Sequence, residues 1–432
     1  MAKMRWNATF AMAVGGMVGG GIFSVLGVVL DLAGPWFLLS FALAGAIGFL
    51  TATSYAGLAR EYGEGGAFRF LHETGRGTVS GLLSWLLVAG YVLTIGVYAY
   101  TFGHYVVAAT GGGAAVERVV GAAVVAALTL LNLRGVQASA RAEVVAVWTK
   151  LAVLALLAVV GIARWAPHRI GDGAPSHGAT GVLVGAAAIF MAYQGFELLT
   201  YDYDDIRDPR RTLPRAMLPA VLTTVAIYCA VGLAAAMLVG GGRLVERGDV
   251  ALAVAGQAAA GDAGRVVVCV AAALSAASAI NATLFATARL CRRIAGHGEL
   301  PEWLASTTCD GVPARGVVVL GVCGAVLAAA GGLGVLVEAA STTFLVTFAV
   351  VNAVAARRLT SWRWASALGA VAATLAAVVV VVRLAVEEPF ALVALGALTV
   401  AAAAARRWTG RRGPDVTDAS SSMSMSTFRS SG

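Results

Sequence analysis

Three features place polar or unusually flexible groups inside apolar stretches of the chain. Lys150 lies eight residues into one such stretch, although the sequence has two lysines against 29 arginines. Glu197 interrupts another stretch, together with Gln194 and Gly195. The first apolar stretch carries the sequence GGMVGGG at 15–21. If these stretches cross a membrane, ionisable side chains inside them are costly and normally face a cavity or a partner, which predicts a functional site.

Each feature also has a purely structural alternative. The glycine cluster fits close helix packing, because Gly15 and Gly19 have small-xxx-small spacing. Glu197 could be hydrogen-bonded at a helix kink, and Lys150 could snorkel or pair permanently with a backbone carbonyl. Unwound backbone at mid-membrane is tolerated only where protein or a water-filled cavity satisfies its polar groups. Two interrupted segments in one chain therefore favour a binding site over packing alone.

The elements that hold these residues are predicted to be transmembrane helices. The 432 residues are 59% hydrophobic and 12% charged, which lies outside the composition of soluble globular proteins. Apolar runs of about 18 or more residues are long enough to cross a bilayer. We expect twelve spans, at 8–30, 33–57, 79–110, 115–133, 142–163, 181–201, 216–239, 264–290, 315–332, 335–356, 364–385 and 388–405.

The basic residues predict the orientation of these spans. Starting from a cytoplasmic N-terminus, 23 of the 31 Lys and Arg fall on the cytoplasmic side, 7 fall outside, and Lys150 lies within a span. This bias predicts a multi-pass protein of the cytoplasmic membrane, surrounded by lipid, with both termini in the cytoplasm. It also explains the net charge of +8 without a nucleic acid partner. The first span is too long for a cleavable signal peptide.

Other sequence patterns restrict which further functions and domains are expected. The five cysteines form no CxxC pair and are expected to be reduced packing residues, and neither a metal nor a cofactor is predicted. The chain has no HExxH or GxSxG motif, so an enzyme is not expected. The domain organisation expected is one transmembrane domain at 1–408, followed by a disordered, Ser-rich cytoplasmic tail at 409–432.

Several motifs resemble those of the amino acid-polyamine-organocation superfamily of permeases. Residues 19–23 are similar to its Gly-Ser/Thr-Gly-Ile-Phe pattern, and residues 190–197 to its Phe-Phe-Ala-Tyr-x-Gly-Phe-Glu pattern. Residues 204–215 resemble its acidic pair followed by Asn-Pro-x-x-x-Ile-Pro-Arg. Gly20 departs from the pattern where the family often has Ser or Thr, and Glu64 departs where Pro is usual.

This resemblance implies the fold. The family fold is an all-α, LeuT-like bundle with a five-plus-five inverted repeat, in which helices 1 and 6 are broken at mid-membrane. Applied here, the repeats span about 8–163 and 181–356, and two extra helices span about 364–405. The sequence halves show no residue-level identity, so the repeat is inferred from the positions of the two interruptions.

The resemblance also implies a function, namely amino acid transport by alternating access. Free N–H groups at the positive end of a helix near Gly21 suit the substrate carboxylate. Bare carbonyl groups of the two breaks suit the ammonium, and Phe196 would cover the pocket, although it could equally be a core aromatic residue. The expected substrate-binding residues are Met17, Val18, Gly19, Gly20, Gly21, Ile22, Met191, Ala192, Gln194, Phe196 and Glu197.

Lys150 is the expected proton-coupling residue. In some members of this family a fifth-span lysine approaches the first break in place of a sodium ion, to which Ser275 and Ser278 could otherwise contribute. We therefore expect proton-coupled symport of neutral amino acids, with the proton as the possible coupling ion. An exchanger of amino acids or polyamines is the main alternative. A non-transporting amino acid sensor or a channel is the alternative of another class, although the pore-lining repeats of a channel are absent from the sequence.

Overall fold

The described part of this computed structural model comprises residues 3–74, 77–134, 140–175, 177–308, 311–397 and 400. The predicted tail at 409–432 and Cys309 lie outside these residues. Within them the secondary structure is helical, and the only extended pairing is an isolated bridge between Met4 and Ile206. The prediction of an all-α protein is therefore confirmed.

The helices follow the predicted spans in order. The first half contains α1 (Trp6–Met17), α2 (Gly21–Ala33), α3 (Phe37–Tyr62), α4 (Gly66–Glu73), α5 (Gly77–Thr110), α6 (Ala114–Leu133) and α7 (Ala140–Ala163). The second half contains α8 (Gly178–Ala188), the 3-10 segments η3 (Phe190–Tyr193) and η4 (Phe196–Thr200), α9 (Pro209–Val239), α10 (Gly241–Glu246), η6 (Gly248–Val250), α11 (Ala251–Gly296), α12 (Ala314–Ala330) and α13 (Leu333–Arg358). Last comes α14 (Arg363–Glu387).

Two features of the helices were not predicted. The short helices α4 and α10 lie between spans, and α11 runs on before the predicted eighth span through a kink at Ala260 and Gly261. Eight helical segments of the described chain are long and apolar enough to cross a membrane, while α8 and α12 are shorter. The twelfth predicted span, 388–405, lies partly outside the described residues, so the number twelve stays a prediction.

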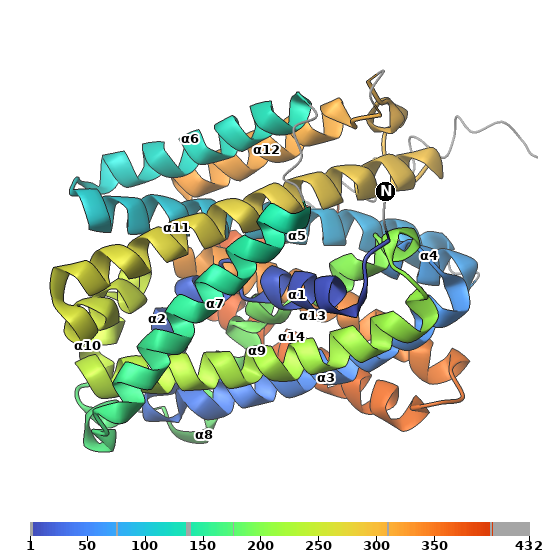
Figure 1. Cartoon of the computed structure of the whole chain (residues 1–432). Coiled ribbons are helices and arrows are strands. Elements are labelled where there is room, and N and C mark those ends of the chain that lie inside the picture. The colour runs from blue at the N-terminus through green and yellow to red at the C-terminus, as the bar shows by residue number, and fades with distance from the viewer. Residues whose placement is uncertain are drawn as a thin grey trace, which may run out of the picture.

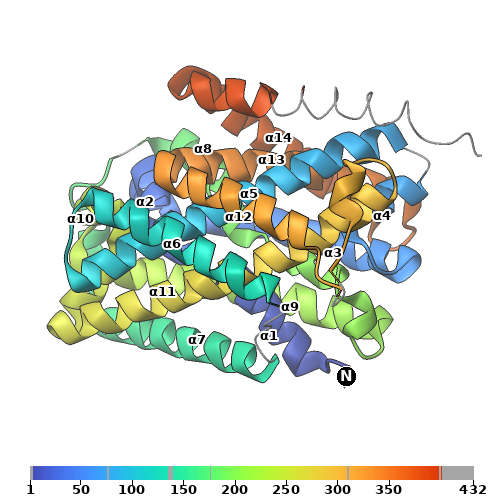
Figure 2. The same cartoon turned by 90° about the horizontal axis from the view of Figure 1, so that it is seen from above.

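The bundle surrounds the two interrupted spans. Figure 1 shows α1, α2 and α13 in the middle, between a layer of α6, α11 and α12 and a layer of α3 and α9. Helix α7 packs on both α9 and α11, and α14 lies beside α13 on the side away from α7 (Figure 2). The residues of both breaks are therefore enclosed by helices from both halves of the chain.

Helices in equivalent positions of the two proposed repeats pack against one another. These contacts join α1 to η4, α3 to α9, α5 to α11, and α6 to α12. They correspond to spans 1 and 6, 2 and 7, 3 and 8, and 4 and 9, which is the pairing expected around a pseudo-two-fold axis in the membrane plane. We call the end of the bundle that carries α4 and residue Met4 the N-terminal end, and the end that carries α10 the opposite end.

Candidate functional site

The first break is short. Helix α1 ends at Met17, residues 18–20 form a turn, and α2 begins at Gly21. Val18 and Gly20 keep nearly helical dihedral angles, with φ −74° and ψ 0° at Val18 and φ −94° and ψ −8° at Gly20. The interruption therefore removes a few helical hydrogen bonds without changing the course of the chain greatly. It still leaves carbonyl groups of α1 and N–H groups of α2 without partners inside their own helix.

Side chains from three other spans satisfy carbonyl groups at the end of α1 and in the turn that follows it. The Lys150 ammonium, on α7, donates to Gly15 O at 2.9 Å. The Tyr228 hydroxyl, on α9, donates to Met17 O at 2.7 Å. The Ser275 hydroxyl, on α11, donates to Gly19 O. These are the hydrogen bonds that unwound backbone needs where water is excluded, and none of the three donors is close in sequence to the break.

The N–H groups at the start of α2 face inward without a side-chain cap. Ser24 N–H donates to Gly20 O at 3.0 Å, so the preceding amides of the first turn have no acceptor within α2. The Ser24 hydroxyl lies 2.8 Å from the hydroxyl of Thr101, on α5. Because the positive end of the helix dipole and these amides point the same way, the start of α2 at Gly21 is suited to an anionic group.

The second break is longer. Helix α8 ends at Ala188, and the chain continues through η3, an extended Gln194 and Gly195 into η4. Gly195 has φ +124°, a conformation that other residues rarely adopt. An added Cβ at Gly195 would also lie 2.7 Å from the carbonyl carbon of Gly16. Glycine is therefore required at 195 both for the turn and for the close approach of the two breaks.

Glu197 holds this second break from within. One of its carboxyl oxygens accepts the Gly195 N–H at 2.7 Å, and the other accepts the Tyr91 hydroxyl, on α5, at 3.1 Å. Glu197 is fully buried. These two donors, one from its own break and one from the third span, fit the structural alternative for Glu197, and its role in binding substrate stays a prediction.

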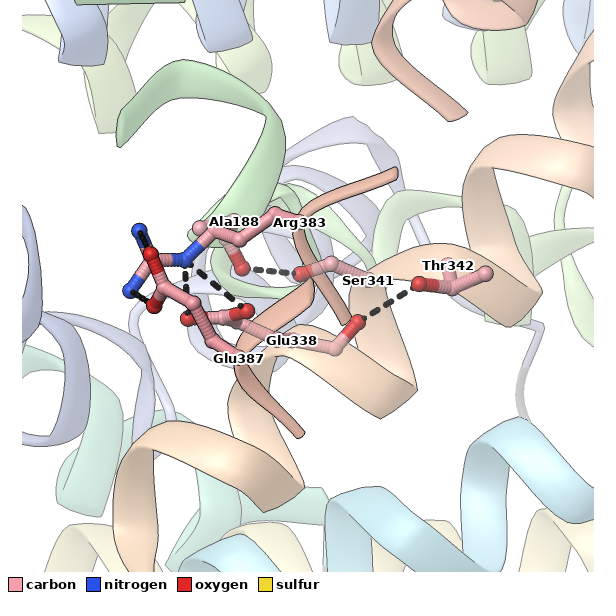
Figure 3. A network of polar contacts seen from close by, with 6 residues as sticks. All are labelled: Ala188, Glu338, Ser341, Thr342, Arg383 and Glu387. Carbon is pink, nitrogen blue, oxygen red and sulfur yellow. Dashed lines mark hydrogen bonds and ion pairs between the residues drawn. The ribbon is translucent and has the colours of Figure 1, made fainter. Parts of the chain in front are cut away.

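Helix α13 holds the other side of the second break. Figure 3 shows the Ser341 hydroxyl donating to Ala188 O at 2.5 Å. The hydroxyl oxygen of Ser341 also accepts the Met191 N–H at 2.9 Å. One turn earlier, Glu338 binds the guanidinium of Arg383 at 3.0 Å, and Arg383 also pairs with Glu387. Helix α13 therefore connects the backbone of the break to an ion-pair cluster at the opposite end of the bundle.

The expected site residues are brought together. The Tyr228 hydroxyl contacts both breaks, because it lies 2.7 Å from Met17 O and 2.9 Å from Ala192 O. Gly16 touches Gly195 through the backbone. All of the expected substrate-binding residues are buried, as is Lys150: Met17, Val18, Gly19, Gly20, Gly21, Ile22, Met191, Ala192, Gln194, Phe196 and Glu197.

Two of these residues have surroundings that differ from the expectation. Phe196 packs edge-on against Tyr55, with ring centroids 5.9 Å apart, and its ring is tilted against that of Phe348, with centroids 5.8 Å apart. These contacts are those of a core aromatic residue, which was the alternative role for Phe196. At Gly20 an added Cβ would overlap the ring of Tyr98. The hydroxyl residue usual in the family does not fit here unless Tyr98 moves, so Gly20 and Tyr98 belong together.

Ion pairs join α11 to two loops at the N-terminal end. Arg293 pairs with Glu64, and Arg289 pairs with Asp202 at 2.6 Å. Gly65 N–H donates to Thr200 O at 3.1 Å, which seats the loop before α4 on the end of η4. Burial raises the pKa of Asp202, against the lowering effect of Arg289. At the opposite end, a cavity of about 390 Å³ lies between α2, η6, α13 and α14.

Sequence reasoning missed two residues of the site. Tyr228 and Ser341 each contact backbone atoms of a break. Neither lies in a recognisable motif, because a single Tyr or Ser in an apolar helix is an ordinary packing residue. Recognising them would have required knowing how α9 and α13 are rotated about their axes. A single sequence does not determine that rotation.

Comparison with known proteins agrees with this arrangement. A family model described as amino acid permease matches residues 5–403. The chain is 32% identical over 366 residues to the inner membrane transport protein YbaT of Escherichia coli, which covers 82% of each chain. It is 26% identical over 362 residues to the methylthioribose transporter of Bacillus subtilis, which covers 79% of this chain and 77% of that one.

A solved structure shares the fold. MhsT, in complex with L-phenylalanine, superposes with a TM-score of 0.65 at 14% identity and covers 88% of this chain and 100% of MhsT. This likeness confirms a LeuT-like arrangement of helices. Together with the family match over nearly the whole chain, it shows that the protein is a multi-pass membrane transporter and belongs to the amino acid permease family of the amino acid-polyamine-organocation superfamily.

Proposed function

We propose that this protein is a proton-coupled symporter of neutral amino acids. The substrate lies between the two breaks, with its carboxylate at the start of α2 and its ammonium near the carbonyl groups of η3. The observation that carries the coupling is the hydrogen bond from Lys150 to Gly15 O, 2.9 Å long, beside the first break. The family match supports an amino acid as the substrate, and MhsT holds L-phenylalanine.

The position of Lys150 supports a proton rather than sodium. An ammonium group donates to the carbonyl of Gly15, while the nearby carbonyl of Gly19 accepts a hydrogen bond from Ser275. Carbonyl oxygens at such a break are the ligands that a sodium ion would need. A lysine in this position provides the positive charge when protonated and removes it when it releases its proton, which couples the charge at the break to proton movement.

The surroundings of Glu197 support a neutral substrate. Both carboxyl oxygens of Glu197 accept hydrogen bonds from the protein, one from Gly195 and one from Tyr91. These two hydrogen bonds hold the break. A substrate with a cationic side chain would compete with these donors for the carboxylate, whereas a neutral side chain leaves them in place. Glu197 thus serves the backbone of the second break.

We place the N-terminal end of the bundle in the cytoplasm, with both termini there, and the protein in the cytoplasmic membrane. The distribution of 23 Lys and Arg against 7 supports this orientation. The relative YbaT carries the description of an inner membrane protein. In this orientation Glu64, Arg293, Asp202 and Arg289 form the cytoplasmic closure, and the cavity beside Glu338 opens to the outside.

Uptake of labelled neutral amino acids into proteoliposomes tests the proposal. A pH gradient, acid outside, should drive accumulation by the wild type, and a sodium gradient should not. In Lys150→Met, accumulation driven by the pH gradient should be lost. Counterflow, which needs no coupling, should be reduced less than accumulation. Lys3→Met is the matched control, because Lys3 is the other lysine of the chain and lies outside the helices.

The outcomes separate the alternatives. Uptake that requires a sodium gradient and persists in Lys150→Met contradicts the coupling proposal. Uptake seen only in vesicles preloaded with amino acid shows that the protein is an exchanger. Binding of an amino acid without any movement of label shows a sensor.

A further inference from the structure

One buried polar atom in the second break, Gln194 Oε1, has no hydrogen-bond partner among the residues that the structure describes. Gln194 is buried, with 1% of its surface exposed, and its Nε2 lies 3.3 Å from the hydroxyl of Tyr98. Its Oε1 is buried and accepts no hydrogen bond from the described residues. Buried side-chain amides almost always have their polar atoms paired, because each unpaired atom loses its hydration without replacement. A buried amide oxygen without a donor inside the proposed binding region therefore indicates a ligand group that completes it.

The position of this amide is fixed by the two breaks. Gln194 lies between η3 and Gly195, in the extended part of the second break. Tyr98, to which its amide points, packs its ring on Gly20 in the first break. The Gln194 side chain therefore reaches from one break toward the other. By contrast, the backbone groups that recognise the shared part of all amino acids lie at Gly21 and along η3.

We infer that the Gln194 carboxamide recognises the side chain of the substrate and selects hydroxyl- and carboxamide-bearing neutral amino acids, such as serine, threonine, asparagine and glutamine. This inference rests on the proposed function and adds the class of side chain to it. A hydroxyl group both donates and accepts, so it completes the amide whichever of its two ends faces Tyr98. An apolar side chain of the same size leaves the amide unpaired.

Threonine and valine give the sharpest comparison, because they have nearly the same shape and differ by a hydroxyl group in place of a methyl group. A site built to hydrogen-bond a substrate hydroxyl discriminates strongly against the analogue that lacks it. We expect wild-type proteoliposomes to show kcat/KM for threonine about 10-fold or more above that for valine. In Gln194→Leu the ratio should fall to about 1, mainly through the loss of threonine transport.

Asn352 provides a matched control. It is another buried amide with an unpaired oxygen, and its Nδ2 donates to Thr51 at 2.9 Å, between α13 and α3 and away from the two breaks. Asn352→Leu should leave the threonine-to-valine ratio unchanged, whatever it does to stability. Serine and alanine form a second substrate pair that should follow threonine and valine in the wild type and in Gln194→Leu.

The outcomes separate the inference from the proposed function. Equal transport of threonine and valine by the wild type overturns the inference and leaves amino acid transport intact. A ratio that survives in Gln194→Leu also overturns it. If Gln194→Leu does not fold, the threonine-to-valine ratio of kcat/KM measured with the wild type still tests the inferred selectivity. A wild type that moves no amino acid in counterflow overturns the proposed function, and the inference with it.

Discussion

The break between α1 and α2 is short, whereas the break between α8 and η4 is long. Carbonyl groups of the first break accept hydrogen bonds from three other spans, while the second break is held partly by Glu197, a residue of its own. Lys150, Tyr228 and Ser275 come from α7, α9 and α11. Glu197 lies two residues after the Gly195 amide that it binds. The first break thus depends on neighbouring helices for these bonds, whereas the second has Glu197 in addition to its donors and acceptors on α5, α9 and α13.

This difference matters for alternating access. A break whose partners lie on separate helices can exchange them when the helices move, so it is suited to couple substrate binding to rearrangement of the bundle. A break that carries its own acceptor keeps that hydrogen bond when its neighbours move. We therefore expect the second break to move as a unit and the first break to change partners. The following substitutions test this contrast, from the largest expected effect to the smallest.

Glu197→Ala should have the largest effect. It leaves the Gly195 N–H and the Tyr91 hydroxyl buried without an acceptor, and each unpaired buried group costs about 1–3 kcal/mol. We expect amino acid counterflow to fall by about 100-fold or more, and the melting temperature of the purified protein to fall. Tyr91→Phe removes only one of the two donors and should be milder in both measurements. Counterflow by Glu197→Ala within about twofold of wild type would show that the second break does not depend on this acid.

Gly20→Ala tests the first break by size. The added methyl group overlaps the ring of Tyr98, so either the ring or the turn must shift. We expect KM for the amino acid to rise by about 10-fold or more, because small displacements of binding groups reduce transport strongly. Combining Gly20→Ala with Tyr98→Ala should restore part of the loss, a non-additive result expected for residues in contact.

The control for this prediction is Gly48→Ala in α3. An added Cβ there would lie 3.6 Å from Tyr193 Cβ, an ordinary contact, so transport should change little. Equal effects at Gly20 and Gly48, or strictly additive effects of Gly20→Ala and Tyr98→Ala, would argue against the pairing of Gly20 with Tyr98.

Tyr228→Phe tests the link between the breaks. Its hydroxyl contacts Met17 O and Ala192 O, and a net hydrogen bond contributes about 0.5–1.5 kcal/mol. We expect KM to rise by about 3- to 10-fold. Tyr193→Phe is the matched comparison, since that hydroxyl joins only the second break to α3, by donating to Phe41 O. If the two variants behave alike in concentration-dependent uptake, Tyr228 has no special role in joining the breaks.

The smallest expected effect is on the pH dependence of thermal stability, and it comes from Glu64 at the N-terminal end. Burial raises the pKa of the Glu64 carboxyl, and the neighbouring Asp204 carboxylate adds to this, while Arg293 lowers it. A carboxyl group whose pKa is higher in the folded than in the unfolded protein lowers the free energy of unfolding as pH rises from the unfolded pKa to the folded pKa. Thermal unfolding measured from about pH 4 upward should show this loss in the wild type and less of it in Glu64→Gln.

Glu73 offers the matching control on the surface. It pairs with Arg69 at 3.6 Å, and both side chains are 47% exposed. Glu73→Gln should leave the pH dependence as it is in the wild type, because an exposed pair contributes little. If the pH profile of thermal unfolding for Glu64→Gln coincides with that of the wild type, Glu64 does not contribute to the pH dependence of stability.

Much of this site could be predicted because its signals are local. Glycine clusters, Gly195 and the intramembrane Glu197 and Lys150 each stand out within one helix, and the structure places all of them at the breaks or beside them. Their distant partners could not be predicted in the same way. Tyr228 and Ser341 are ordinary residues in their own helices, and only the packing of α9 and α13 on the breaks gives them a role.

The lengths of the breaks also escaped sequence reasoning. The first apolar run has glycine at 15, 16, 19, 20 and 21, yet α1 stays helical through Met17. The sixth span has a single glycine between Gln194 and Phe196, yet its chain is irregular from η3 through η4. Two glycines of the first run allow close packing, since Gly16 meets Gly195 and Gly20 meets Tyr98. These contacts support the packing interpretation of the cluster, and its role in binding substrate stays a prediction.

An experimental structure of the protein with a transported amino acid is the most direct test of the two-break site. We predict that the carboxylate lies at the amides of Gly21 and Ile22 and that the ammonium lies near the carbonyl groups of η3. The side chain should lie beside Gln194. An amino acid bound instead only in the cavity between α2, α13 and α14, with the two breaks closed and unchanged, would contradict the central claim.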